Sequence, residues 1–389
     1  MHKVFSRSVS VEEISEISDD WDEFWQSGLA GYDFLIARDR AGIEWRYLRH
    51  QRRPQRGGQE AEIGRMTQPC TRGYAAVDLA VLVPTKDRPG KVRKLLDSIA
   101  AQSARPGRIV FIDGGESIRE LVQGYEDQVA VEHHVCQPPG QIRQRNMGIR
   151  LLDERTPLVA LLDDDIVLEP AAIESMIAFW NRCEPATAGV GFNITNTPPE
   201  PRTWVRDLFF LSASVPGRVL KSGATTSNCQ VKRDIRVEWL CGGATSWRLD
   251  LLRRFSHKPV ATPWAIAEDV VFSYPIGKQH PLYVCAAAQV RHEHESDYRV
   301  AHPHRFHGWT QALFVMHFVE ANEDLSRAAF LWMIVGTVLG RIVVGAATLE
   351  RRHLEFALGQ ALAVSQGLWA LAHGRSLTTV IEGSRESVG

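Results

Sequence analysis

The stretch VDLAVLVPTKDRPGKVRKLLDSIAAQSA, residues 77–104, contains the pattern of a strand followed directly by a helix. Its first part is a continuous apolar run that Pro84 ends, which is typical of a buried strand. Its second part repeats apolar side chains at helical spacing, namely Val92, Leu95, Leu96 and Ile99. The stretch therefore predicts one strand–turn–helix unit.

The same alternation continues along the chain. Apolar strand patterns recur at residues 108–115, 129–135 and 157–165, and helical patterns occupy residues 138–154 and 170–183. Strands that alternate with helices in this way predict an α/β sheet with helices on both faces. Ligands of such sheets bind beyond the carboxyl ends of the strands, so we expect the functional side chains at that edge.

The composition is that of a folded chain without a strongly charged partner. The 389 residues are 44% hydrophobic and 23% charged, and the net charge is −1. Nucleic-acid binding needs a basic face or interleaved aromatic residues, and the sequence shows neither, so we expect no nucleic-acid partner. The six cysteines form no CxxC pair, and the N-terminal residues turn acidic where a secretory signal needs an apolar run. We therefore expect a cytoplasmic location.

Three consecutive aspartates, Asp163, Asp164 and Asp165, follow the fourth predicted strand. Adjacent ionised carboxylates repel one another unless a cation or hydrogen-bond donors compensate them. A hard divalent ion with oxygen ligands does so, and it is often shared with phosphate oxygens. In an extended segment Asp163 and Asp165 point the same way and Asp164 points the opposite way, so two carboxylates reach one site. The alternative is an acidic loop that caps the next helix.

Six segments of the chain occur in a characteristic order. They are VLVPTKDRP (81–89), FIDGG (111–115), GQIRQRNMGI (140–149), LLDDDIVLEP (161–170), GGATSWRLDLL (242–252) and AEDVVFS (267–273). Together they resemble the motif order of inverting family 2 glycosyltransferases with the GT-A fold, over about residues 78–295. The resemblance implies a Rossmann-like mixed, mostly parallel sheet with helices on both faces, and a nucleotide-sugar donor bound with Mg²⁺ or Mn²⁺.

The resemblance also implies which residues hold the nucleotide sugar. It assigns this role to Pro84, Thr85, Arg88, Asp113, Arg145, Asn146, Asp163 and Asp164. In the second segment Asp113 is followed by Gly114, where the family usually has another aspartate. Arg145 and Asn146 correspond to the family's RNxG element, and a solvated surface charge is the alternative for this arginine.

Metal binding and catalysis are implied for the acidic residues. Asp163 and Asp165 correspond to the DxD motif, with Asp165 as a metal ligand and Asp163 as a ribose or metal contact. Asp269 corresponds to the catalytic base and Glu268 to its neighbour. Attack by an acceptor hydroxyl needs a carboxylate to take the proton, while the metal neutralises the departing diphosphate. Acidic residues at an ordinary helix N-terminus are the alternative for this pair.

The remaining candidates concern the acceptor and the metal. By the same resemblance, Gly242 and Gly243 correspond to the small residues beneath the acceptor, which let sugar and backbone approach closely. Trp247 and Trp264 are candidates to stack on a sugar face, with core packing as the alternative. Some family members complete the metal site with a histidine, which here corresponds to His292 or His294. Because one residue separates these two, both face one side of a strand.

The ends of the chain differ from its middle. We predict an N-terminal extension and linker at residues 1–70, the GT-A domain at 71–310, and a helical, membrane-associating region at 311–389. The apolar block at residues 328–348 approaches the length of a membrane span but contains Arg341 near its middle. This pattern favours an amphipathic or re-entrant helix on the inner membrane surface, with a buried or dimer-forming helical hairpin as the alternative.

The sequence thus predicts a metal-dependent inverting glycosyltransferase with a UDP-, dTDP- or GDP-sugar as the donor. A glycan or polyprenyl-linked acceptor of the cell envelope would suit a peripheral protein on the cytoplasmic face of the membrane, and a homo-oligomer is compatible with the tail. The alternatives are a sugar nucleotidyltransferase and a scaffold that binds nucleotide sugar or glycan without turnover. The nucleotidyltransferase would be expected to carry a glycine-rich loop after the first strand, and VPTKDRPGK (83–91) matches such a loop poorly.

Overall fold

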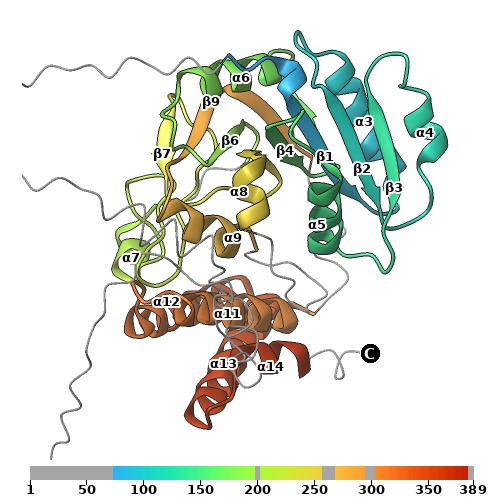
Figure 1. Cartoon of the computed structure of the whole chain (residues 1–389). Helices are drawn as coiled ribbons and strands as arrows, with labels where there is room; N and C mark the ends of the chain where they lie inside the picture. The colour runs from blue at the N-terminus through green and yellow to red at the C-terminus, as the bar shows by residue number, and fades with distance from the viewer. Residues whose placement is uncertain (1–72, 198–201, 256–267, 294–302, 384–389) are drawn as a thin grey trace, which may run out of the picture. The chain divides into compact units, whose positions relative to one another are not determined.

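The computed structural model describes residues 73–197, 202–255, 268–293 and 303–383 (Figure 1). All the described elements belong to one compact unit, Gln68–Gly389. Its strands are β1 (Leu79–Thr85), β2 (Arg108–Asp113), β3 (Val131–Val135), β4 (Leu158–Leu162), β5 (Ile166–Leu168), β6 (Gly189–Ile194), β7 (Ile235–Val237), β8 (Ala244–Arg248) and β9 (Leu282–His292). The helices follow in two groups.

Helices of the first group accompany the sheet. They are η2 (Ala76–Asp78), α3 (Pro89–Ala100), α4 (Arg119–Gln123), α5 (Gln141–Leu151), α6 (Ala172–Arg182), α7 (Trp204–Leu208), α8 (Leu249–Arg254) and α9 (Glu268–Gly277). The second group comes after the last strand and consists of α11 (His304–Glu320), α12 (Arg327–Thr348), α13 (Arg351–Ala372) and α14 (Leu377–Gly383).

In the described part of the chain, nine strands form one sheet in the order β3-β2-β1-β4-β8-β6-β9-β5, with β7 beside β9. The pairs within β3-β2-β1-β4 are parallel, as is the pair of β6 and β9. The pairs that involve β5, β7 or β8 are antiparallel. The sheet is therefore mixed, and its parallel strands β3, β2, β1 and β4 come from the strand–helix alternation in the first half of the domain.

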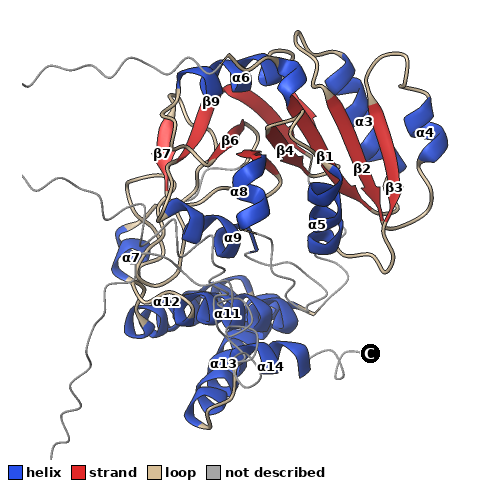
Figure 2. Cartoon of the chain, in the orientation of Figure 1, coloured by secondary structure: helices blue, strands red, loops and turns tan. Residues whose placement is uncertain are grey.

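Helices cover both faces of the sheet, as Figure 2 shows. Alternate residues of β1 enter different apolar cores: Leu79 and Val81 join the core under α3 and α6, whereas Ala80 and Leu82 join the core under α5 and α8. Every residue of β1 is buried, because a central parallel strand is covered on both sides. The predicted α/β class with helices on both faces is confirmed.

The helices after the sheet pack mainly on one another, around a separate apolar core. They also contact α9. The Tyr274 hydroxyl donates a hydrogen bond to Asp324 in the turn between α11 and α12, and Lys278 binds both Asp324 and Asn322. The ring of Tyr274 lies edge-on to Phe318, with centroids 5.5 Å apart. The C-terminal half of α9 is thus tied to the helical region.

Candidate functional site

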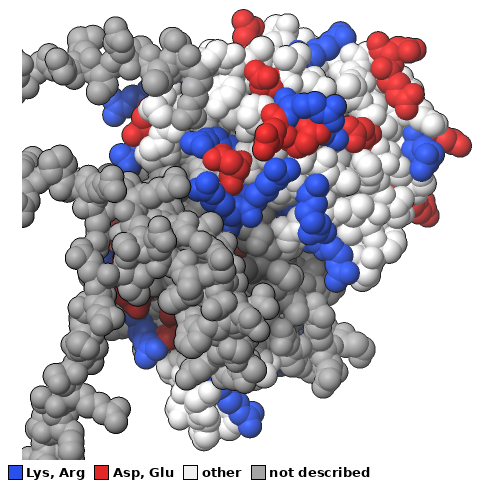
Figure 3. All heavy atoms as spheres, viewed as in Figure 1, with Lys and Arg blue, Asp and Glu red and all other residues white. Residues whose placement is uncertain are grey.

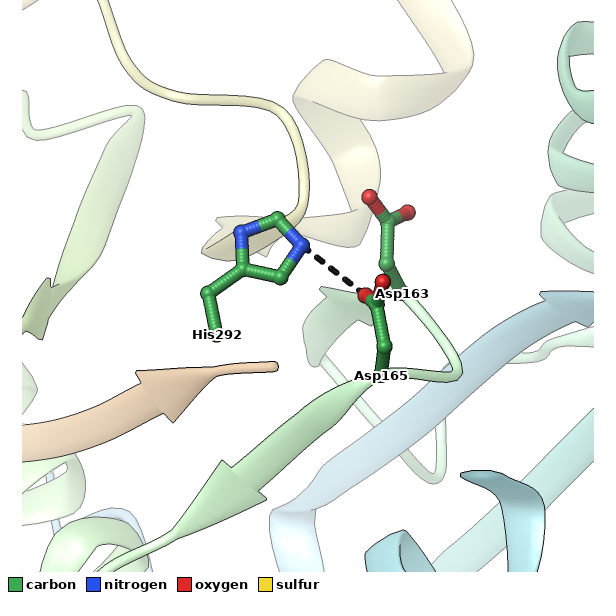
Figure 4. A group of neighbouring side chains, drawn as sticks. All are labelled: Asp163, Asp165 and His292. Carbon is green, nitrogen blue, oxygen red and sulfur yellow. Dashed lines mark ion pairs between the residues drawn. The ribbon is translucent and has the colours of Figure 1, made fainter. Parts of the chain in front are cut away.

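Two carboxylates and one imidazole converge at the end of β4 (Figure 4). Single ligand atoms of Asp163, Asp165 and His292 all lie within 4.8 Å of one another. The turn after β4 supplies the two aspartates. Antiparallel pairing of β5 with β9 sets Ile166 opposite His292, which brings the imidazole beside the turn. His292 Nε2 lies 2.8 Å from Asp165 Oδ1.

Asp164 points away from this cluster and joins β4 to the loop after β1. Its Oδ2 accepts a hydrogen bond of 2.7 Å from the Thr85 hydroxyl, and its Oδ1 lies 3.2 Å from Arg88 Nη1. Burial raises the pKa of Asp164, although Thr85 and Arg88 act in the opposite direction. Arg88 is half-exposed and also lies 3.9 Å from Asp165 Oδ2. Its guanidinium therefore borders the cluster and remains open to solvent.

Arg145 is a buried cation between two acidic groups. Its Nη2 donates to Asp163 Oδ1 at 2.8 Å, and its Nη1 donates to Glu268 Oε1 at 2.5 Å. Burial alone would lower the pKa of Arg145, but the charges of Asp163 and Glu268 outweigh it and raise the pKa. The guanidinium therefore stays charged and connects the aspartate turn to the first residue described in α9.

Glu268 and Asp269 are removed from water at the start of α9. This removal raises the pKa of Glu268 to about 6, against the opposing charge of Arg145. It also raises the pKa of Asp269, against the amide donors of Val270 and Gly242 and the charge of Arg145. Asp269 borders a small cavity, and a carboxylate with a raised pKa is suited to accept a proton.

Gly242 and Gly243 lie where a side chain would collide with this acidic site. A Cβ on Gly243 would sit 2.5 Å from Asp163 Oδ2, and one on Gly242 would sit 3.0 Å from the Cβ of Asp269. The Asp163 amide also donates to the Gly243 carbonyl at 2.9 Å. The two glycines therefore give β8 and the aspartate turn room to approach each other.

The donor set of the cluster suits a divalent metal ion. Carboxylate oxygens with an imidazole nitrogen are ligands that Mn²⁺ accepts, whereas Mg²⁺ prefers oxygen alone. Asp163 and Asp165 bring two negative charges together, beside His292 and the arginines Arg88 and Arg145. Asp163, Asp165 and His292 therefore fit a metal ion.

The Asp113 carboxylate accepts hydrogen bonds from the loop that follows β2. Its Oδ1 accepts a hydrogen bond from the Gly115 amide at 3.0 Å, and its Oδ2 accepts one from the Ile118 amide at 3.2 Å. His133 Nε2 lies 3.0 Å from the same Oδ2, and the whole Asp113 residue is 1% exposed. The carboxylate predicted to contact the nucleotide base is thus occupied in shaping its loop.

Other predicted residues have varied positions. Pro84 is buried within β1, and Asn146 is partly buried in α5. Trp247 is only 2% exposed, and its indole donates to the Thr245 hydroxyl at 2.8 Å. The faces of the Trp247 ring are therefore packed in the core beside the small cavity. The prediction that Trp247 stacks on a sugar is wrong, and the alternative of core packing fits. Trp264 and His294 lie outside the described residues.

Two glutamines of α5 belong to the site but were not among the sequence candidates. Gln141 Nε2 donates to Asp163 Oδ1 at 3.1 Å. Gln144 is buried and donates to the carbonyls of Thr85 and Ile112, at 2.8 and 2.6 Å. The signal was present in the sequence, because Gln141 and Arg145 are four residues apart and so share one helix face.

The comparisons with known proteins agree with this geometry. Residues 80–240 match the family model described as "Glycosyl transferase family 2". The matched segment contains β1, the loop at Asp113, α5 and the three aspartates. The resemblance to family 2 glycosyltransferases is therefore confirmed. Gly242, Gly243, Glu268, Asp269 and His292 lie beyond the match.

Relatives of known name share only part of the chain. Validoxylamine A glucosyltransferase of Streptomyces hygroscopicus subsp. limoneus is 28% identical over 136 residues, which are 33% of this chain and 30% of that protein. The counterpart from Streptomyces hygroscopicus subsp. jinggangensis is also 28% identical over 136 residues. The alignment thus spans about a third of the length of these relatives.

Solved structures with a similar course of the chain include a mannosyltransferase and TarS. Mannosyltransferase PcManGT from Pyrobaculum calidifontis, solved with GDP-Man and Mn²⁺, is 15% identical and gives a TM-score of 0.47, over 78% of this chain and 89% of its own. Residues 1–349 of TarS from S. aureus are 16% identical with a TM-score of 0.45, over 79% of this chain and 91% of the other.

Proposed function

We propose that this protein is a divalent-metal-dependent inverting glycosyltransferase that uses a nucleotide-sugar donor. The observation that carries the proposal is the connected acidic site: Asp163, Asp165 and His292 on one side, Glu268 and Asp269 on the other, with Arg145 between them. The family match, which includes the aspartate turn, supports the same activity. One half of this arrangement suits a metal-bound diphosphate and the other half suits proton removal.

The proposed reaction is a single displacement at the anomeric carbon. The acceptor oxygen forms a bond to this carbon while the bond to the diphosphate oxygen breaks, and the diphosphate leaves with the electron pair. Asp269 takes the proton of the acceptor hydroxyl, which its raised pKa favours. A bound metal ion would neutralise charge on the leaving diphosphate. Attack opposite to the leaving group inverts the configuration.

Residues at the carboxyl ends of β1, β2 and β4 are proposed to hold the donor. Arg88 is half-exposed beside Asp164 and Asp165, which supports a role for its guanidinium in binding a phosphate oxygen. Asp113 supports this pocket through the loop that its carboxylate orders. Asp163, Asp165 and His292 would hold Mn²⁺ or Mg²⁺, and the imidazole favours Mn²⁺.

The acceptor side is proposed from the surroundings of Asp269. A small cavity lies beside it, lined by Gly242 and Ser273 among others, and we place the acceptor hydroxyl on the side of Asp269. An envelope glycan or a polyprenyl-linked sugar would suit a protein held at the cytoplasmic face of the inner membrane, as we propose for this one. UDP-, dTDP- and GDP-sugars are the donors to test.

Product analysis tests the reaction class. The purified full chain is incubated with the donor panel and Mn²⁺, and the released nucleotide is identified by chromatography. We expect a nucleoside diphosphate. Pyrophosphate would instead indicate a nucleotidyltransferase, and tight donor binding without turnover would indicate a scaffold.

Asp269→Asn tests the base. Because asparagine accepts no proton under these conditions, we expect transfer to fall about 10²-fold or more while donor binding is kept. Donor binding is measured by calorimetry and transfer by nucleotide release. Asp127→Asn, at an exposed position after α4, is the matched control and should behave as the wild type. Full transfer activity in Asp269→Asn would refute the assignment.

A further inference from the structure

Helix α12 is apolar and largely uncovered. Among the described residues it is the one helix long and apolar enough to cross a membrane, with 22 residues and a mean hydropathy of 1.9 in its most apolar window. Only 28% of that window is buried within the protein. A core helix of a soluble protein with this composition would be mostly buried. Burial in a protein core therefore does not explain the apolar composition of α12, and the exposure of its apolar side chains needs another explanation.

The first half of α12 continues into an apolar surface on α7. Trp332 donates its indole N–H to the Leu208 carbonyl at 2.9 Å, and its ring lies 4.9 Å from that of Phe209. Large apolar side chains remain exposed on both helices. We call these residues the α7–α12 surface: Trp204 (77% exposed), Leu208 (51%), Trp332 (44%), Val335 (45%), Leu339 (51%) and Val343 (66%).

The second half of α12 is exposed around most of its circumference. Ile342, Val343 and Val344 are consecutive and are all more than 40% exposed. Consecutive helical residues point about 100° apart, so these three face widely different directions. Leu349, directly after the helix, is 88% exposed. A folded protein partner covers one stripe of a helix, whereas a surrounding apolar medium covers all sides.

The charge of Arg341 faces α13 and not the exposed apolar side of α12. Its Nη1 lies 3.1 Å from His353 Nδ1, and its guanidinium lies over the ring of Phe356, 4.3 Å from the centroid. Both partners are on α13, so the charge is turned toward that helix. The cost of a charge in an apolar medium, which the sequence suggested for this position, is thereby reduced.

Arg351 and Arg352 follow the exposed end of α12 and are themselves exposed. Arg352 is paired with Glu350, and its long side chain extends from the tip of the helical hairpin. Basic side chains at the end of an apolar segment remain in the headgroup layer of a membrane while the apolar part enters it. The view in Figure 3 shows a group of basic atoms beside uncharged ones at the lower end, where α13 lies in Figure 1.

We propose that α12 lies along one leaflet of a lipid bilayer, with the α7–α12 surface and the exposed second half of the helix among the acyl chains and the side chains of Arg351 and Arg352 reaching to the headgroup layer. The occupant is the bilayer itself, because apolar exposure extends around the helix. Trp204 on α7 and Trp332 in the first half of α12 are also exposed, and tryptophans are enriched at membrane interfaces. This proposal does not depend on the reaction that the acidic site performs.

Vesicle flotation of the full chain tests the proposal. Wild-type protein is expected to float with phosphatidylcholine vesicles and to float more completely when phosphatidylglycerol is added. The variant Leu339→Glu/Val343→Glu should lower the partition coefficient about tenfold or more on both vesicle types, because carboxylates resist transfer into an apolar medium. Arg351→Gln/Arg352→Gln should remove only the gain from the anionic lipid.

The control is Val135→Glu, a charge placed at an apolar residue of β3 that is 54% exposed. It should float as the wild type does. Thermal unfolding followed by circular dichroism shows whether each variant is folded. Unchanged flotation of folded Leu339→Glu/Val343→Glu would refute membrane insertion.

Two other occupants of the α7–α12 surface would give different results, and either result would overturn the proposal. A second copy is indicated if light scattering without vesicles shows a dimer that Leu339→Glu/Val343→Glu abolishes, with no flotation of the wild type. Another segment of the same chain is indicated if the wild type is a monomer without vesicles and does not float with either vesicle type.

Discussion

Arg145 holds together residues that are far apart in the sequence. It forms charge-assisted hydrogen bonds with Asp163 on the turn after β4 and with Glu268 at the start of α9. Its side chain is 2% exposed, so water cannot replace either bond. The resemblance placed Arg145 near the nucleotide, whereas its contacts give it the role of positioning the acidic groups.

Arg145→Lys separates charge from geometry. Lysine keeps the positive charge but lacks the planar fork that binds two carboxylates at once. We expect kcat to fall about tenfold to a hundredfold, since one charge-assisted hydrogen bond contributes about 1.5–3 kcal/mol. Arg145→Met leaves buried carboxylates uncompensated and should also lower the free energy of unfolding, by about 3–5 kcal/mol.

Arg143→Lys on the same helix is the matched control for this pair, because Arg143 is exposed. Steady-state kinetics and chemical denaturation are measured for all three variants. If folded Arg145→Lys had the kcat of the wild type, the positioning role would be wrong.

The pH dependence of the rate reports on Glu268 and Asp269. A base must be ionised, and the raised pKa of Asp269 means that the ionised form is lost at a higher pH than for an ordinary aspartate as the pH falls. Glu268→Gln removes a neighbouring negative charge, which should lower the pKa of Asp269. We therefore expect the acid limb of kcat/KM to move to lower pH in this variant. An acid limb that stays in place or moves upward would contradict the arrangement.

At the scale of elements, the approach of β8 to the aspartate turn depends on small residues. A methyl group on Gly243 would collide with Asp163 Oδ2, and the turn is also tied to Gly243 through the backbone. Gly90 on α3 provides a contrast, since a Cβ there meets nothing within 4 Å.

Gly243→Ala should therefore displace Asp163 and weaken metal binding. We expect the Mn²⁺ concentration for half-maximal activity to rise about tenfold or more, since displaced ligands bind metal less well. Gly90→Ala should leave this concentration unchanged. Activity titrations with Mn²⁺ measure both variants. Equal metal requirements in the two would show that the turn tolerates the methyl group.

The elements that the sequence predicted are those with local signals. The apolar run before Thr85 became β1, and the helical spacing of Val92, Leu95 and Ile99 became the buried face of α3. The placement of His292 beside Asp165 depends on the pairing of β9 with β5, which joins residues more than a hundred positions apart. Pairing of this kind has no local pattern, so sequence alone left His292 and His294 as alternatives.

The same limit applies to single residues of the site. Asp163 and Asp165 were predicted to share a direction by alternation along an extended segment. Both do reach the cluster with His292, but they lie in a turn closed by a hydrogen bond of 3.2 Å from the Ile166 amide to the Asp163 carbonyl, so the alternation rule does not explain their placement. No local rule predicts the burial of Trp247, because it depends on tertiary packing, which includes the contact of its ring with Phe272 of α9.

At the scale of the whole molecule, donor and metal should stabilise the fold together. Both are proposed to bind the folded chain at the carboxyl ends of the same strands, and a ligand that binds only the folded state raises the melting temperature. We expect nucleoside diphosphate with Mn²⁺ to raise the melting temperature by more than the two separate shifts combined. In His292→Ala this excess should disappear, whereas the exposed control His373→Ala should keep it.

Thermal shift with and without each ligand measures this coupling. Independent, additive shifts in the wild type would mean that metal and nucleotide do not share ligands. The test needs no acceptor, so it is possible before the acceptor is identified.

The attachment of α9 to the helical region has a practical consequence. The Glu268 end of α9 is fixed through Arg145, and its other end is fixed through Tyr274 and Lys278 to the turn at Asp324. Deleting helices α11 to α14 to make the protein easier to handle would remove Phe318 and Asp324, which contact α9. A shortened chain would then lose the support of the helix that carries Asp269, so its inactivity would say nothing about whether the tail also binds lipid.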